Sequence, residues 1–131
     1  MTNTPPRRIL ITGSASGIGA AIARRLAAPG VAFLLHTRRN QAGLEAVAAA
    51  SRAAGAVTET MLGDLADPAL APRLVETMVG RHGGIDVLVA NAGFADRTKL
   101  ADLTDAAMTA SVEAIQSGFF RLARAAMGPL R

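Results

Sequence analysis

Short apolar segments alternate along this chain with longer segments in which apolar residues recur every three or four positions. The short segments have the length of strands and lie at residues 9–12, 31–36, 57–62 and 85–90. The longer segments predict helices, and the first of them places Ile18, Ile22 and Leu26 on one buried face with Arg24 and Arg25 outward. This regular alternation predicts an α/β fold with a parallel sheet covered on both faces.

Capping residues and prolines set the expected helix boundaries. Asn40 is the expected N-cap of the second helix, because its side-chain oxygen can accept a bond from a free N–H of the first turn. In the third helix Leu70, Leu74 and Met78 share one face, but Pro72 cannot donate a helical hydrogen bond. We therefore expect regular helix there only from about Pro72.

The last segment, residues 103–130, predicts one or two amphipathic helices. Ile115, Phe119, Leu122 and Ala126 fall on one apolar stripe of this segment.

Composition excludes several classes of protein. Of the 131 residues, 50% are hydrophobic and 18% are charged, which excludes a disordered chain. The longest apolar run, Val31 to Leu35, is far shorter than the roughly 18 residues needed to span a bilayer. The chain has no cysteine, so disulfides, thiolate catalysis and cysteine metal sites are excluded, and we expect no metal site. The length predicts one domain, residues 1–131, and a cytoplasmic location is the default expectation.

The net charge of +4 does not indicate a nucleic-acid-binding protein. The arginines are scattered in pairs, whereas nucleic-acid-binding proteins concentrate basic residues on one face. Aromatic side chains that could stack on bases are limited to four Phe, with no Tyr and no Trp.

A glycine-rich turn joins the first predicted strand to the first predicted helix, within Thr12 to Gly19. Gly13 permits a tight turn, Gly17 allows close approach to a pyrophosphate, and Gly19 allows close helix packing. The free N–H groups that open the helix can bind anions. We therefore expect a dinucleotide site, although a glycine-rich turn without a ligand remains the alternative. The candidate contacts in this turn are Gly13, Ser14, Ser16, Gly17, Ile18 and Gly19.

The spacing GxxxGxG with Thr12 in front resembles the short-chain dehydrogenase/reductase family, and the resemblance covers essentially the whole chain. It implies a Rossmann-like three-layer α/β/α fold with an incomplete sheet of about four strands in the order 3-2-1-4. It also implies that Asp64 and Leu65 contact the adenine ring, while Asn91, Ala92 and Gly93 steady the sheet and border the adenine ribose. Taken singly, Asp64 could be a helix-capping acid and Asn91 a turn residue.

The residues after the second predicted strand favour NADP(H) over NAD(H). A carboxylate at this place binds the ribose 2′-hydroxyl of NAD and repels a 2′-phosphate. Here Thr37 stands where an NAD-type relative would have its Asp, and the guanidinium of Arg38 can pair with a 2′-phosphate. Arg39 is either a second contact or a solvated charge, and His36 is expected to be packed at the strand end.

The resemblance implies hydride transfer between nicotinamide and a carbonyl or alcohol carbon, assisted by Ser, Asn and a YxxxK helix. This chain has no Tyr, its only Lys, Lys99, follows the NAG motif, and Ile115 stands where the family has Asn. We therefore expect the NADP-binding portion of an oxidoreductase that is inactive alone and has no catalytic residue of its own. The alternative is a non-catalytic dinucleotide-binding or assembly module that acts through a partner chain.

The resemblance also places the family's further strands beyond the fourth. Residues 85–90 would then form an unpaired edge, and unpaired edges favour self-association. The final helix, from about residue 114 to 130, is the surface through which family members commonly pair, although its apolar stripe could equally be ordinary core. We therefore expect a homo-oligomer or a complementing chain, and no membrane or nucleic-acid partner.

Overall fold

The computed structural model describes residues 7–94 and 96–130. Four parallel strands form one sheet in the order β3-β2-β1-β4, which confirms the expected order. The strands are β1 (Arg7–Thr12), β2 (Val31–Thr37), β3 (Val57–Leu62) and β4 (Val87–Ala90). The helices are α1 (Gly17–Leu26), α2 (Gln41–Ala53), α3 (Leu70–His82), α4 (Asp105–Val112) and α5 (Gly118–Ala126).

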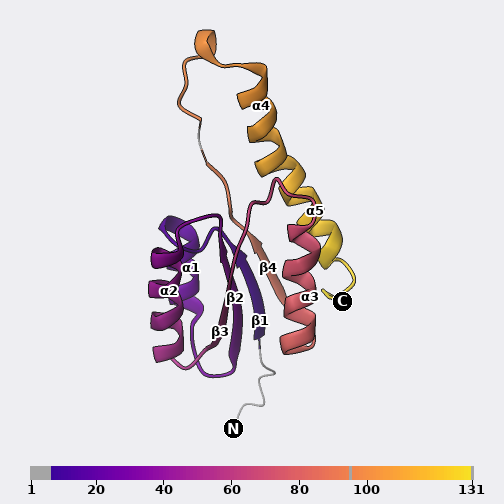
Figure 1. Ribbon diagram of the computed structural model, residues 1–131. Helices are drawn as coiled ribbons and strands as arrows, with labels where there is room; N and C mark the ends of the chain where they lie inside the picture. The colour runs from indigo at the N-terminus through magenta and orange to yellow at the C-terminus, as the bar shows by residue number, and fades with distance from the viewer. Residues whose placement is uncertain (1–6, 95, 131) are drawn as a thin grey trace.

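Helices cover both faces of the sheet (Figure 1), with α1 and α2 on one face and α3 and α5 on the other. Successive side chains of a strand point to opposite faces, so β1 divides its residues between two cores. Ile9 and Ile11 pack toward α1 and α2, whereas Leu10 packs toward α3 and α5. The three-layer Rossmann-like architecture is thereby confirmed.

The packing face of α1 differs from the expected one. Ile18 is 72% exposed, and Ile22 and Leu26 are only half-buried. The residues that α1 buries are Gly19, Ala20 and Ala23. The expectation that Ile18 faces the core is wrong, because the first turn of α1 directs Gly19 toward Gly13 and Asn91, where there is no room for a Cβ, and leaves Ile18 at the surface.

The third helix begins at Leu70, two residues before the expected start. Pro72 is its third residue, where the missing N–H would have no partner within the helix. Leu70, Leu74 and Met78 are buried as expected. Asn40 also caps α2 as expected, because its Oδ1 accepts a hydrogen bond from the Gly43 N–H at 3.0 Å.

The fourth strand begins at Val87 rather than at Ile85, although Ile85 is buried. It pairs with β1 from Ile9↔Val87 to Thr12↔Ala90. The residues Val87, Leu88 and Val89 are half-buried, in keeping with their place on the outer strand of the described sheet.

The last helical segment is interrupted by a π-helical turn, Glu113–Ser117, between α4 and α5. Leu122 and Ala126 of α5 are buried, but Ile115 and Phe119 are 38% and 58% exposed. Only the second half of the stripe is therefore buried. Ile115 lies in the π turn, whose extra residue changes the helical register. Phe119 lies in α5 itself, next to Gly118, which is the residue that packs on Leu65. None of residues 105–112, all of which the structure describes, is buried, and α4 extends beyond the sheet (Figure 1).

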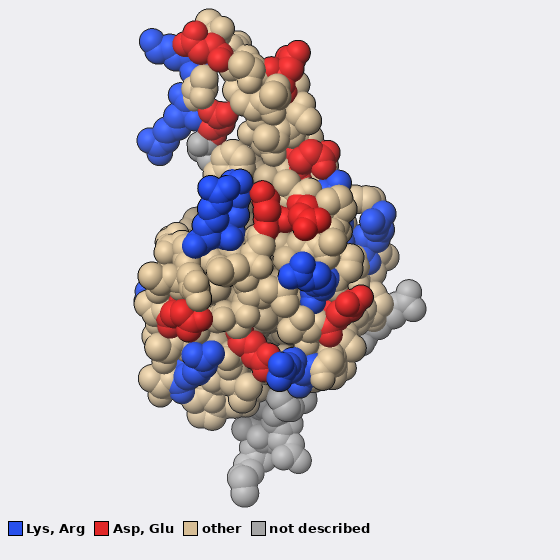
Figure 2. Space-filling model, in the orientation of Figure 1, with Lys and Arg blue, Asp and Glu red and all other residues tan. Residues whose placement is uncertain are grey.

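The surface charges do not form a basic stripe on the face that Figure 2 shows, where Lys and Arg are interspersed with Asp and Glu. Among the helices that the structure describes, none has the length and hydropathy required to cross a membrane.

Leu74→Ala tests the core between the sheet and α3. Leu74 is fully buried, and truncation of a buried leucine costs about 2–5 kcal/mol of unfolding free energy. Urea unfolding of the chain measures this loss. Leu100→Ala is the matched control, because Leu100 is 87% exposed and its truncation is expected to change stability by less than about 0.5 kcal/mol. Equal losses for the two variants would contradict the burial of Leu74.

Candidate functional site

The predicted site residues gather at the carboxyl ends of the strands. In the sheet order β3-β2-β1-β4, β2 and β3 are added on one side of β1 and β4 is added on the other side. α/β proteins bind ligands in the crevice at such a switch point. A cleft of about 360 Å³ lies there, which is within the usual size of small-molecule sites. Its lining comprises Gly13, Ala15, Ser16, Gly17, Ile18, His36, Thr37, Arg38, Asn91, Ala92 and Gly93.

A second, smaller cavity of about 70 Å³ adjoins this cleft and shares His36, Arg38, Ala92 and Gly93 with it. Asp64 and Leu65 line this second cavity, together with Phe94, Ala114 and Ile115. The structure thus brings the ends of β2, β3 and β4 around two adjoining hollows. Arg39 is exposed and is not among the lining residues of either one.

Two glycines of the turn after β1 need positive φ angles, +67° at Gly13 and +56° at Gly17. Their surroundings differ. A Cβ on Gly13 would lie 2.7 Å from the Cα of Ala92, whereas a Cβ on Gly17 would meet no described atom within 4 Å. Gly13 is therefore required by the protein's own packing, and Gly17 leaves the cleft side of the turn open.

Gly19 is required by the close contact of α1 with the turn and with the Asn91 side chain, just after β4. A Cβ there would overlap the carbonyl oxygen of Gly13 and lie 2.6 Å from Nδ2 of Asn91. The role expected for Gly19, close helix packing, agrees with this geometry.

Ser14 and Ser16 have different surroundings. Ser14 is fully buried, and its Oγ accepts a hydrogen bond from the His36 N–H at 3.0 Å. Its backbone N–H donates to the His36 carbonyl at 2.8 Å, so Ser14 holds the turn against β2 and its side chain does not reach the cleft. Ser16 is the exposed N-cap of α1, and its side chain makes no capping bond among the described residues.

His36 is a lining residue of both hollows that the candidate contacts did not include. It is 2% exposed, its Nε2 donates to the Gly63 carbonyl at 2.8 Å, and its Nδ1 accepts from the Gly13 N–H at 3.3 Å. Burial lowers the pKa of His36 from its ordinary value of 6.5, against smaller opposing effects of Gly63 and Asp64. The expected packing at the strand end is confirmed. The sequence feature that could have indicated a role for His36 in the cleft was its position in an otherwise apolar strand.

Asn91 joins the end of β4 to the turn after β1. Its Nδ2 donates to the Gly13 carbonyl at 3.0 Å. Thr12 Oγ1 accepts from the N–H groups of Asn91 and Ala92 at 3.1 and 3.2 Å. These contacts steady the sheet at the cleft.

Arg38 lines both hollows and pairs with Asp64, with Nε 3.3 Å from Oδ2. Their side chains are 53% and 40% exposed, so this is a weak solvated pair. Thr37 is 9% exposed and lines the larger cleft. The end of β2 therefore presents a cation and no carboxylate of its own.

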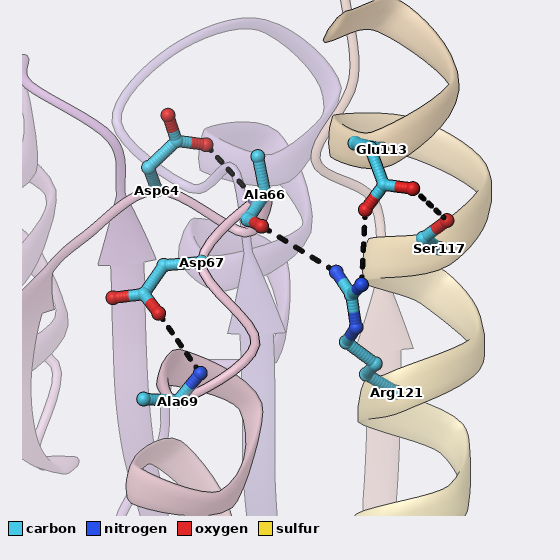
Figure 3. A network of polar contacts seen from close by, with 7 residues as sticks. All are labelled: Asp64, Ala66, Asp67, Ala69, Glu113, Ser117 and Arg121. Carbon is cyan, nitrogen blue, oxygen red and sulfur yellow. Dashed lines mark hydrogen bonds and ion pairs between the residues drawn. The ribbon is translucent and has the colours of Figure 1, made fainter. Parts of the chain in front are cut away.

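Arg121 connects α5 to the loop that follows β3 (Figure 3). It pairs with Glu113 at 2.9 Å and donates to the Ala66 carbonyl at 3.4 Å. Glu113 also accepts from the Ser117 hydroxyl at 3.2 Å, across the π turn. Sequence reasoning missed this network, whose link from Arg121 to Ala66 joins residues 55 positions apart.

Asp64 and Gly118 complete the contact between that loop and α5. Asp64 Oδ1 accepts from the Ala66 N–H at 2.9 Å, which shapes the loop (Figure 3). A Cβ on Gly118 would lie 3.0 Å from the Cβ of Leu65, so α5 packs directly on the lining of the smaller cavity. Among the described residues, no cluster of His, Asp and Glu could hold a metal ion.

The family model for short chain dehydrogenases matches residues 7–131. The chain belongs to the short-chain dehydrogenase family. Sepiapterin reductase of Chlorobaculum tepidum is 37% identical over 123 residues, which are 89% of this chain and 50% of that protein. This short-chain dehydrogenase chain spans about half the length of the curated relatives it matches, with 48% and 50% for two of them.

Solved structures of short-chain dehydrogenases share the fold. A short-chain dehydrogenase from Burkholderia cenocepacia J2315 in complex with NADP has a TM-score of 0.91 at 32% identity, and the match covers 98% of this chain and 53% of that one. An NADH-dependent reductase complexed with NAD has a TM-score of 0.85 at 32% identity, with 96% and 52% covered.

Gly13→Ala and Gly17→Ala separate the two glycine roles. Both variants place alanine at a positive φ, which costs roughly 1–2 kcal/mol. Only Gly13→Ala adds an overlap with backbone, that of Ala92. We therefore expect a larger loss of unfolding free energy for Gly13→Ala in urea titrations. Equal losses would show that Gly13 is not in tight steric contact with the backbone of Ala92.

His36 also makes stability depend on pH. Because its folded pKa lies below 6.5, the unfolded chain binds a proton first as the pH falls. This contribution to stability is complete above about pH 6.5 and is lost as the pH falls toward the folded pKa. Urea unfolding at pH 8 and pH 5 should show a smaller pH-dependent loss in His36→Asn than in the unmodified chain. The imidazole NMR signals, with His82→Gln for assignment, should show His36 titrating below its ordinary value.

Proposed function

We propose that this chain binds NADP(H) and forms the cofactor-binding part of an oxidoreductase that reduces carbonyls or oxidises alcohols. The observation that carries the proposal is the cleft at the end of β1, with an open glycine turn on one side and Arg38 on another. A pyrophosphate needs close backbone approach and free N–H donors, and a 2′-phosphate needs a cation.

The residues of the turn fit a pyrophosphate. The backbone of Gly17 is unobstructed on its cleft side, and α1 starts there with its unpaired N–H groups. The positive end of the α1 dipole favours the phosphate charges, and the uncapped hydroxyl of Ser16 can donate to them. Ile18 lines the same cleft and is exposed, which supports a role as an apolar contact of the ligand.

The adenosine end fits the hollow beyond the turn. Asp64 and Leu65 line its smaller part, and Ala92 and Gly93 border both parts. Asn91 supports this wall through its side chain, whose Nδ2 donates to the Gly13 carbonyl. Thr37 and Arg38 favour NADP(H), since a carboxylate that would repel the 2′-phosphate is replaced by a hydroxyl beside a guanidinium. Arg39, being exposed, supplies at most a second positive charge at the rim.

The bound nicotinamide would donate the hydride in carbonyl reduction or accept it in alcohol oxidation, and the residues of this chain would hold and orient the cofactor. General acid catalysis of the proton step contributes roughly 10²–10⁴-fold. The 131 residues contain no Tyr, and their one Lys, Lys99, lies in the exposed segment after β4. Ile115, which lines the smaller cavity, cannot donate a proton or a hydrogen bond from its side chain. We therefore propose that these 131 residues bind cofactor without turnover and need a proton donor supplied from outside them.

Calorimetric titration with NADPH and NADH tests the binding part of this proposal. We expect tighter binding of NADPH, and Arg38→Ala should weaken it by about ten- to a hundred-fold, the value of a charge-assisted bond. The affinity for NADH should change little, because NADH lacks the phosphate. Arg25→Ala is the control, since Arg25 is exposed at the opposite end of α1.

Two results would contradict the proposal. A folded chain that binds neither nucleotide would favour an assembly module, whose oligomeric state light scattering would report. Binding of both nucleotides with equal affinity, unchanged in Arg38→Ala, would leave a dinucleotide site but reject the NADP preference.

A further inference from the structure

Both ring nitrogens of His36 are engaged by backbone groups of different loops. Nε2 lies 2.8 Å from the Gly63 carbonyl, which can only accept a hydrogen bond, so this nitrogen carries the proton. Nδ1 lies 3.3 Å from the Gly13 N–H, which can only donate, so this nitrogen is unprotonated. The neutral imidazole with its proton on Nε2 is the one form that satisfies both partners.

The backbone of the same residue holds the next residue of the turn. The His36 N–H donates to Ser14 Oγ at 3.0 Å, and the His36 carbonyl accepts from the Ser14 N–H at 2.8 Å. Ser14 Oγ also lies 3.1 Å from the His36 carbonyl, to which its hydroxyl can donate. The ring bond to Gly13 is therefore one of four contacts between this residue and the start of the glycine turn, and of these four it alone depends on a titratable group.

We propose that His36 is a positioning residue of the dinucleotide site, which pins Gly13 through Nδ1 while neutral and releases it when protonated. Protonation of Nδ1 replaces an acceptor by a donor that faces the Gly13 N–H, so the bond becomes a repulsive contact. The turn would then lose the position in which Gly17 and the start of α1 meet the phosphates. This inference rests on the proposed function, because it explains how that cleft is kept ready for a ligand.

The charges around the ring are few. Asp64 after β3 and Arg38 after β2 line the smaller cavity with His36 and are paired with each other. The glycine turn, residues 13–19, and the segment after β4, residues 91–93, contain no charged residue. Burial lowers the pKa of His36, so the pinned form is maintained at neutral pH and release requires acid. Affinity for the dinucleotide should therefore fall as the pH falls through this pKa.

A charge effect would have the opposite sign. If the imidazolium acted on the phosphates only as a positive charge, a lower pH would strengthen binding. The direction of the pH dependence therefore separates positioning from charge attraction.

His36→Asn and His36→Gln form a matched pair. The Asn side chain can place its oxygen near the position of Nδ1 and accept from Gly13, whereas Gln can place its amide nitrogen near Nε2 and donate to Gly63. A merely structural role would penalise both. A positioning role through Nδ1 predicts that Asn retains affinity and that Gln loses it by about three- to ten-fold at every pH, the value of one neutral hydrogen bond.

The experiment is calorimetric titration of the chain and both variants with NADP⁺ between pH 5 and pH 8. The 2′-phosphate itself titrates near pH 6, but equally for all three proteins, so the ratio of affinities removes its effect. We expect the affinity of the unmodified chain relative to His36→Asn to fall about three- to ten-fold between pH 8 and pH 5. A constant ratio, or a ratio that rises in acid, would overturn the proposal.

A measurement without ligand keeps this inference separate from the proposed function. In the free chain the ¹⁵N–¹H signal of Gly13 should shift with the same pKa as the His36 ring, and it should not do so in His36→Asn. If Gly13 follows the ring but no nucleotide binds at pH 8, the proposed function fails and the control of the turn by His36 stands. A Gly13 signal that ignores the ring would overturn the inference whether or not nucleotide binds.

Discussion

The contact of three backbone segments at the end of β1 is the constraint on which the rest of the structure depends. The turn at Gly13, the first turn of α1 at Gly19 and the start of the segment after β4 approach one another with almost no side chain between them. A Cβ at either glycine would overlap a neighbouring backbone or side-chain atom. Because α1 is held this close, its buried face consists of Gly19, Ala20 and Ala23, and the cleft above it stays open.

Much of the fold could be predicted because strand and helix periods alternate clearly along the chain. The family resemblance predicted the strand order, and the residue pattern predicted the bounds of the third strand. Both predictions agree with the structure. Ile18 shows where the pattern fails: apolar spacing marks a stripe, but the close approach of α1 to the sheet selected small residues instead. The stripe of the last segment is divided for another reason, since the π turn that contains Ile115 breaks the register that periodicity assumes.

The candidate site could be located from the glycine turn and the strand ends, but the partners within it could not. His36 acts through two backbone groups from segments 23 and 27 residues away, and no local pattern records such contacts. Arg121 reaches back 55 residues to the loop after β3. Ser14 belongs to the recognised motif, yet its hydroxyl faces the interior and binds β2. Motifs therefore predicted which segments meet, and the structure was needed to show which atoms face the cleft.

The pair of Arg38 and Asp64 has a consequence for how an anion would enter the cleft. In the free protein the guanidinium already has a counterion, with Nε 3.3 Å from a carboxylate oxygen, and its side chain is held toward the hollow. An arriving anion would exchange with that carboxylate rather than meet a bare cation. Because an exposed pair contributes only about 0–1 kcal/mol, the exchange is cheap in free energy, and a dianion would compete better than a single negative charge. The arginine thus begins with part of its conformational freedom already removed, so less remains to be lost when a ligand binds.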